Sequence, residues 1–231
     1  MATGLILAAA GRGERLGTGE PKALCRLAGE PVIVHALRGA LSSGVVDVVA
    51  VAAPPGRVDD VRALVAAGVA DVTVVPGGSD RPESVAAALA SLPRDVETVL
   101  VHDAARCLTP PEVFVAVARA VAEGAGAVVP AIAVADTIKR VAGEQVVGTP
   151  DRGTLRAVQT PQGFRRDVLE RAHAAPAKGA TDDAGMAELA GFPVRVVPGH
   201  DEAFKITRSV DLLLAEAILS RREGSRAVPG D

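Results

Sequence analysis

Residues 5–17 read LILAAAGRGERLG, an apolar run that passes directly into a glycine-rich turn. The run Leu5–Ala9 has the length and composition of a buried β-strand, and Gly11 and Gly13 allow backbone amides to approach a phosphate. In doubly wound folds such a turn lies at the carboxyl edge of the sheet, where ligands bind. The third glycine falls at position 17 rather than 16, so the dinucleotide fingerprint fails, and no P-loop GK[ST] follows. Alone, the turn fits phosphate binding and a plain connection equally well.

Beyond this turn, short valine-rich runs alternate with alanine-rich amphipathic stretches through the first 130 residues. The runs are mostly apolar rather than alternating in polarity, which is typical of strands buried on both faces of a parallel sheet. Repeated strand-then-helix order with right-handed crossovers predicts an α/β fold with a three-layer, doubly wound, mostly parallel, Rossmann-like sheet. The expected strands are Leu5–Ala9, Asp47–Ala52, Val72–Val75, Thr98–His102 and Ala127–Pro130, and the expected helices are Val32–Ser42, Asp59–Ala67, Pro82–Ala90 and Glu112–Glu123.

The alternation stops at Ile132–Arg156, where glycines and a proline interrupt short β-like pieces. This segment predicts a protruding β-hairpin arm rather than a second domain. After it the pattern resumes, so we expect a single domain over residues 1–223, an arm at about 132–156 and a flexible tail at 224–231. The remaining expected elements are helices at Arg166–His173, Asp183–Leu189 and Asp211–Arg222 and a strand at Val194–Val197.

Composition narrows the class of protein. The 231 residues are 48% hydrophobic and 23% charged with a net charge of -3, which predicts one soluble globular domain and excludes a disordered chain. Without Trp or Tyr, with four Phe and with no basic excess, the chain offers little to nucleic acid. The most apolar of the long windows, Val113–Ala135, is interrupted by Arg119, Glu123 and Pro130 and is too polar to span a membrane. Two cysteines form no disulfide framework, so we expect a cytoplasmic protein.

Lys22 is the first side chain that favours phosphate binding over a plain connection at the glycine-rich turn. The chain has 21 Arg but only four Lys, and this one follows Pro21 seven residues after Arg15. A lysine supplies a compact point charge, so Arg15 and Lys22 are candidates to converge on one polyphosphate. The competing interpretation is a solvated loop residue.

An ordered set of motifs extends this pattern across the chain. The segments are Ala9–Arg15, Pro21-Lys22, Gly77–Val85, His102–Arg106, Asp136–Lys139, Thr160–Gln162, Thr181–Ala184 and Phe204–Thr207. Together they resemble the 2-C-methyl-D-erythritol 4-phosphate cytidylyltransferase family of the non-mevalonate isoprenoid pathway, over roughly residues 3–220. The chain departs from the family pattern at Ala8, Ser79 and Ala203, and none of these removes a charged catalytic group.

The resemblance implies a nucleotidyltransferase fold and Mg²⁺-dependent transfer of CMP from CTP to methylerythritol phosphate, with release of pyrophosphate. It also implies a homodimer in which each arm reaches the partner's active site, and a metal site at Asp103. The implied catalytic residues are Arg15, Lys22, Arg152 and Lys205; the implied nucleotide-binding residues are Ala9, Ala10, Gly11, Gly13, Gly78, Arg81, Ser84 and Asp103; and the implied substrate-binding residues are Arg106, Thr137, Arg152, Thr160, Glu202 and Lys205.

The position of Asp103 supports a metal site independently of the resemblance. This residue directly follows an expected strand, so its carboxylate should lie at the ligand-binding edge of the sheet, and Mg²⁺ prefers one or two carboxylates plus phosphates and water. A helix N-cap is the alternative role for Asp103. We expect His102 to be a packing residue, and Asp182 and Asp183 to cap a helix rather than form a catalytic pair.

Three other functions stay open at this stage. A cytidylyltransferase acting on ribitol 5-phosphate would share the fold and the CTP loops. A nicotinamide-dependent oxidoreductase would need the fingerprint that fails after the first strand. A CTP-binding module without catalysis would bind CTP and release no pyrophosphate.

Overall fold

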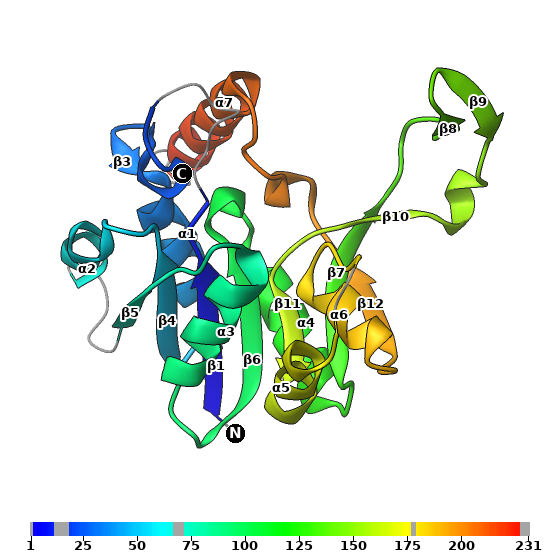
Figure 1. Cartoon of the computed structure of the whole chain (residues 1–231). Helices are drawn as coiled ribbons and strands as arrows, with labels where there is room; N and C mark the ends of the chain where they lie inside the picture. Colours follow the sequence, from blue (N-terminus) through cyan, green and yellow to red (C-terminus); the bar gives the residue numbers. More distant parts are fainter. Residues whose placement is uncertain (1, 12–18, 67–71, 177–178, 227–231) are drawn as a thin grey trace, which may run out of the picture.

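The computed structural model describes residues 2–11, 19–66, 72–176 and 179–226, and its centre is an eight-stranded, mostly parallel sheet (Figure 1). The chain runs from β1 outward through β4 to β5, then returns to β6 on the other side of β1. These four strands are parallel, so their carboxyl ends meet at one edge of the sheet. Their bounds are β1 (Ala2–Ala8), β4 (Val48–Ala53), β5 (Val72–Pro76) and β6 (Val96–Asp103).

Two strands of the sheet are antiparallel to their neighbours, and the sequence predicted neither of them. β11 (Gln162–Arg165) lies antiparallel between β6 and β7 (Ala127–Ala133). β7 also pairs with β10 (Arg156–Val158) and, in parallel, with β12 (Val194–Pro198). β11 escaped prediction because four residues, QGFR, carry no apolar run. Its Gly163 is required by packing, since a Cβ there would lie 2.5 Å from Val117 Cγ1.

Helices cover both faces of the sheet, which confirms the predicted three-layer architecture. Alternate residues of β1 face opposite layers: Leu5 and Leu7 join one buried cluster and Ile6 joins the other. The first layer also receives α7 (Ser209–Arg226), which continues past the expected end at Arg222. One face carries α1 (Val32–Leu41), α2 (Val58–Ala66) and α4 (Pro111–Ala122), and the other carries α3 (Arg81–Ser91), α5 (Arg166–Ala174) and α6 (Asp183–Leu189).

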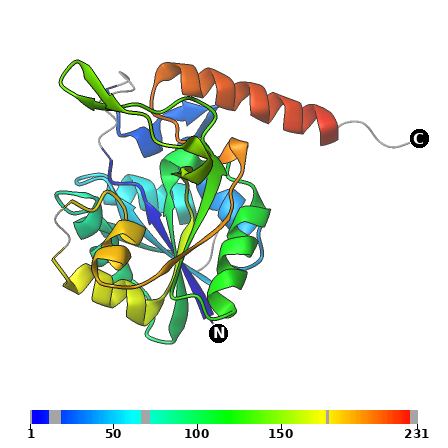
Figure 2. The same ribbon diagram turned by 90° about the vertical axis from the view of Figure 1, so that its right-hand side faces the viewer.

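The predicted arm leaves the sheet between β7 and β10. It carries the hairpin β8 (Arg140–Ala142) and β9 (Gln145–Gly148) and the short 3-10 turn η4 (Arg152–Thr154), and it projects beyond the sheet at the same end of the molecule as α7 (Figures 1 and 2). Its side chains Val141 and Val146 are 60% and 58% exposed. Within the described residues, no helix combines the length and apolar character needed to cross a bilayer.

Candidate active site

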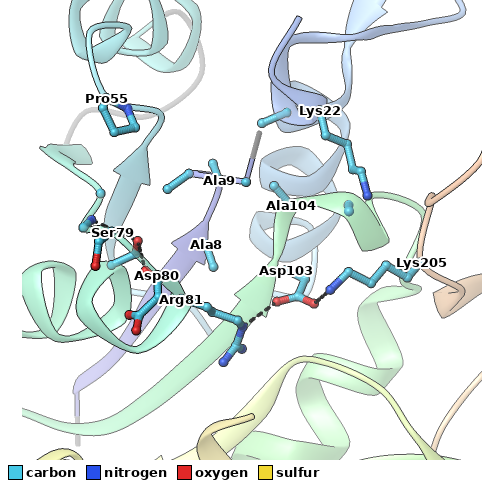
Figure 3. A pocket seen from close by; sticks show the side chains of 17 residues that line it. Ala8, Ala9, Lys22, Pro55, Ser79, Asp80, Arg81, Asp103, Ala104 and Lys205 are labelled. Carbon is cyan, nitrogen blue, oxygen red and sulfur yellow. Dashed lines mark hydrogen bonds and ion pairs between the residues drawn. The ribbon is translucent and has the colours of Figure 1, made fainter. Parts of the chain in front are cut away.

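A cavity of about 850 Å³ opens at the carboxyl ends of β1, β4, β5 and β6. Figure 3 shows its polar side chains converging from several loops. The lining brings together nine predicted residues, all from the nucleotide-binding and catalytic sets: Ala9, Ala10, Gly11, Lys22, Gly78, Arg81, Ser84, Asp103 and Lys205.

The first wall of the cavity is made by two loops packed against each other. Gly77 is needed for this contact, because a Cβ there would lie 2.3 Å from Ala10 Cβ and 3.0 Å from Ser84 Oγ. The buried Ser84 hydroxyl accepts a hydrogen bond from Gly78 N at 3.1 Å and donates one to Asp80 O at 2.7 Å. Asp80 in turn caps α3 by accepting from Glu83 N at 2.9 Å. Ser84 therefore shapes the loop whose backbone faces the cavity.

Asp103 lies at the centre of the cavity's charged groups. Its Oδ1 accepts from Arg81 Nε at 3.2 Å and its Oδ2 accepts from Lys205 Nζ at 2.7 Å (Figure 3). Burial acts to raise the pKa of Asp103, but Arg81 and Lys205 outweigh it and hold this pKa well below its usual range. The side chain makes no capping hydrogen bond to the following 3-10 turn, η3 (Ala104–Arg106), so the N-cap alternative is wrong.

Lys22 reaches the cavity from the side opposite α3 (Figure 3). It begins η2 (Lys22–Leu24), a single turn fixed by the buried side chains of Ala23 and Leu24. Arg15 and Gly13 lie outside the described residues, so their predicted roles stay predictions.

A second cavity of about 260 Å³ adjoins the first and shares Arg81, Asp103 and Lys205 with it. Its wall includes Arg106 and Thr160, both predicted to face substrate. The Thr160 hydroxyl accepts from Asp103 N at 3.0 Å and contacts His102 Nδ1 at 2.9 Å, which ties the wall of this cavity to the end of β6. Arg106 Nη1 donates to Ala203 O at 2.8 Å. Burial lowers the pKa of Arg106, although the nearby negative charge of Asp103 acts to raise it.

Three predicted substrate residues lie away from both cavities. Glu202, in η5 (Asp201–Ala203), forms ion pairs with Arg221 and Arg222 of α7, so its carboxylate fixes the C-terminal helix to the loop that carries Lys205. Thr137 and Arg152 are on the arm, where Arg152 Nη1 donates to Ala135 O at 2.7 Å. Within one chain the structure does not bring these arm residues to the cavities.

The buried carboxylate that holds Arg81 from behind was not predicted from the sequence. Asp182 caps α6 as predicted, accepting from Gly185 N at 2.9 Å, but Asp183 does not cap. Its fully buried carboxylate accepts from Arg81 Nη1 at 2.6 Å and contacts His173 Nε2 at 3.0 Å. Because Asp182 and Asp183 are adjacent at the start of a helix, the sequence predicts a capping role for both. The contact of Asp183 with Arg81, 102 residues earlier in the chain, is what separates their roles in the structure.

Asp103 offers the chemistry expected of a magnesium ligand. Among the described residues, no three His, Cys, Asp or Glu side chains cluster into a metal site built from protein alone. Mg²⁺ instead takes one or two carboxylates and completes its shell with phosphate oxygens and water. An ionised carboxylate beside a cavity large enough for a nucleotide fits that requirement.

A cavity of nucleotide size at the carboxyl edge of parallel strands, with Lys22, Arg81 and Lys205 around it, fits an enzyme of the nucleotidyltransferase class. The sequence profile of the 2-C-methyl-D-erythritol 4-phosphate cytidylyltransferase family matches residues 3–221. The chain is 52% identical to the protein of that name from Streptomyces avermitilis, over 95% of this chain and 92% of the relative. It is 54% identical to the one from Frankia casuarinae, over 94% of this chain and 80% of the relative. The chain therefore belongs to this family and is a cytidylyltransferase.

Solved structures agree with this assignment. The 2-C-methyl-D-erythritol 4-phosphate cytidylyltransferase of Thermus thermophilus is 35% identical with a TM-score of 0.77, over 93% of this chain and 98% of that chain. The 4-diphosphocytidyl-2C-methyl-D-erythritol synthase of Anaerococcus prevotii is 26% identical with a TM-score of 0.84, over 95% of this chain and 99% of that chain.

The buried histidine behind the second cavity predicts a pH-dependent stability. Burial lowers the pKa of His102 to about 4, against about 6.5 in an unfolded chain. Between these values the unfolded state binds a proton that the folded state excludes, so the free energy of unfolding falls as pH drops through this window. A shift of this size corresponds to a loss of roughly 3 kcal/mol. Urea unfolding of the wild type and of His102→Asn, repeated at several pH values from neutral to about 4.5, measures this loss. If the free energy of unfolding fell equally with pH in both proteins, a buried neutral His102 would be contradicted.

Proposed function

We propose that this chain transfers the cytidylyl group of CTP to 2-C-methyl-D-erythritol 4-phosphate and releases pyrophosphate. One observation carries the proposal: two adjoining cavities of about 850 and 260 Å³ share Arg81, Asp103 and Lys205. The larger cavity suits CTP and the smaller suits the phosphate of the acceptor. Asp103 and Lys205 would then lie where the two phosphates must meet, while Arg81 would face the nucleotide.

The reaction needs charge neutralisation more than proton transfer. A phosphate oxygen of the acceptor attacks the α-phosphorus of CTP in line, the new P–O bond forms, and the bond to the β-phosphate breaks. A phosphate monoester has a second pKa of about 6, so it is already largely dianionic at neutral pH and needs no general base. The barrier lies in bringing two polyanions together, which cations and positioning lower.

The cations of the site fit this task. Lys22, with Arg15, would hold the triphosphate and stabilise the developing charge at the α-phosphorus. Lys205 lies between the two cavities and would bind the transferring phosphate, while Arg106 and Thr160 would orient the acceptor. The backbone of Ala9, Ala10, Gly11 and Gly13 would face the nucleotide, and Gly78, Arg81 and Ser84 would form the end that receives the pyrimidine.

Asp103 would hold Mg²⁺ together with the triphosphate. The ion, when bound, neutralises phosphate charge. The Asp103 carboxylate is already ionised, so it can exchange a cationic partner for the metal without losing a proton.

A homodimer would complete the acceptor site. The arm exposes Val141, Val146 and Val147, and an isolated two-stranded hairpin of this size is marginal in water. Packing in an isologous dimer would bury these side chains and carry Thr137 and Arg152 to the other subunit's acceptor site.

The central assay is pyrophosphate release with CTP, Mg²⁺ and methylerythritol phosphate. We expect turnover only when all three are present, because each supplies one part of the charge balance above. An equal rate with ribitol 5-phosphate would instead support the sister activity, and CTP binding without pyrophosphate release would support a binding module. Turnover that persists in EDTA would contradict the role of Mg²⁺.

Subunit complementation tests the shared site. Lys22→Ala removes a cation worth about 2–4 kcal/mol of transition-state stabilisation, and Arg152→Ala removes the arm's charge, so each homodimer should be inactive. In a 1:1 mixture, half of the dimers are mixed and each holds one intact site, so about a quarter of wild-type activity should return. No recovery, in a mixture shown by mass spectrometry to exchange subunits, would refute delivery of Arg152 across the dimer.

A further inference from the structure

Arg81 is held by two carboxylates that differ in how firmly they are fixed. Asp103 accepts from its Nε at 3.2 Å, and the Asp103 side chain is 12% exposed at the cavity wall. Asp183 accepts from its Nη1 at 2.6 Å, and the Asp183 side chain is fully buried. The shorter charge-assisted bond to the buried carboxylate is the stronger of the two. Arg81 therefore has one partner inside the cavity and one behind it.

Asp183 is itself fixed from both sides along the chain. The amide of Gln162, a residue only 1% exposed, donates to Asp182 Oδ2 at 2.6 Å and accepts from Ala184 N at 3.0 Å. The residues before and after Asp183 are thus both hydrogen-bonded to β11. The second oxygen of Asp183 contacts His173 Nε2 at 3.0 Å, and the His173 side chain is 8% exposed. The carboxylate has little freedom to follow Arg81 if the arginine moves.

We propose that Asp183 is a positioning residue that fixes the Arg81 guanidinium at the boundary between the two cavities. Asp103 can then change partners when ligands arrive, while Arg81 stays in place. This inference rests on the proposed function, because it takes the Arg81 wall as part of the CTP site. The Asp183 carboxylate thus has a role although it lines neither cavity. Gln162 and His173 would act indirectly, by holding Asp183 and its neighbours in place.

The first test reads the position of Arg81 without any substrate. In ¹⁵N-labelled protein the Nε–H of a guanidinium held by two carboxylates should exchange slowly with solvent, and Arg81→Lys identifies its resonance by removing it. Asp183→Asn keeps the size of the side chain and one oxygen acceptor but removes the charge. We expect the Arg81 resonance to broaden or vanish in Asp183→Asn. A resonance as protected as in wild type would overturn the proposal.

The second test reads the consequence for nucleotide binding. The Kd of CTP, measured by calorimetry without acceptor so that no turnover occurs, should rise about tenfold in Asp183→Asn, as expected when a charge-assisted hydrogen bond loses its fixed partner. Leu169→Ala is the matched control, because Leu169 is fully buried in α5, the helix that carries His173. It should destabilise the same layer and leave the Kd unchanged. An equal rise in Leu169→Ala would show that general loosening, not positioning, is responsible.

A third variant keeps the proposal testable if Asp183→Asn fails to fold. Arg81→Lys retains a positive charge at a side chain that is 26% exposed, but a lysine cannot span two carboxylates. It should raise the Kd of CTP about tenfold even where Asp183→Asn cannot be purified, and an unchanged Kd would overturn the proposal. Where Asp183→Asn does fold, the double variant should bind CTP no more weakly than Arg81→Lys alone. Additive losses would overturn the proposal. Absence of pyrophosphate release in the wild-type protein would refute the proposed function instead, and the resonance measurement would still decide the position of Arg81.

Discussion

The carboxylate of Asp103 accepts from Arg81 on one side and from Lys205 on the other, and these two contacts organise the site. Arg81 begins α3 after β5, Asp103 ends β6, and Lys205 lies in the segment between η5 and α7. Three distant parts of the chain therefore meet through one negative charge. Without that charge, two cations would face each other across the wall of the cavity, which electrostatic repulsion disfavours.

The segment that carries Lys205 is fixed on both of its flanks. Ile206 N donates to Ala105 O at 2.8 Å, and Arg106 Nη1 donates to Ala203 O at 2.8 Å, so η3 holds the segment before and after the lysine. Glu202 adds ion pairs to the last turns of α7. The C-terminal helix is thus connected to the site through Glu202, although α7 lines neither cavity.

Much of this arrangement could be predicted from the sequence, because the relevant signals are local. The apolar runs indicated the parallel strands, and the glycine-rich turn after β1 and the position of Asp103 placed the cavity at the correct edge. β11 and the Asp183 contact could not be predicted, since each depends on a partner far along the chain. The family resemblance implied that Glu202 faces substrate, but the structure pairs its carboxylate with Arg221 and Arg222 of α7.

The Mg²⁺ dependence of Asp103→Asn tests whether the site is built around the charge of Asp103. The asparagine keeps the shape and one oxygen but loses the charge that attracts the metal. We expect the Mg²⁺ concentration for half-maximal pyrophosphate release to rise about tenfold, the equivalent of roughly 1.4 kcal/mol, and added Mg²⁺ to recover part of the activity. An unchanged Mg²⁺ dependence together with a lower melting temperature would contradict the account and reduce Asp103 to a structural residue.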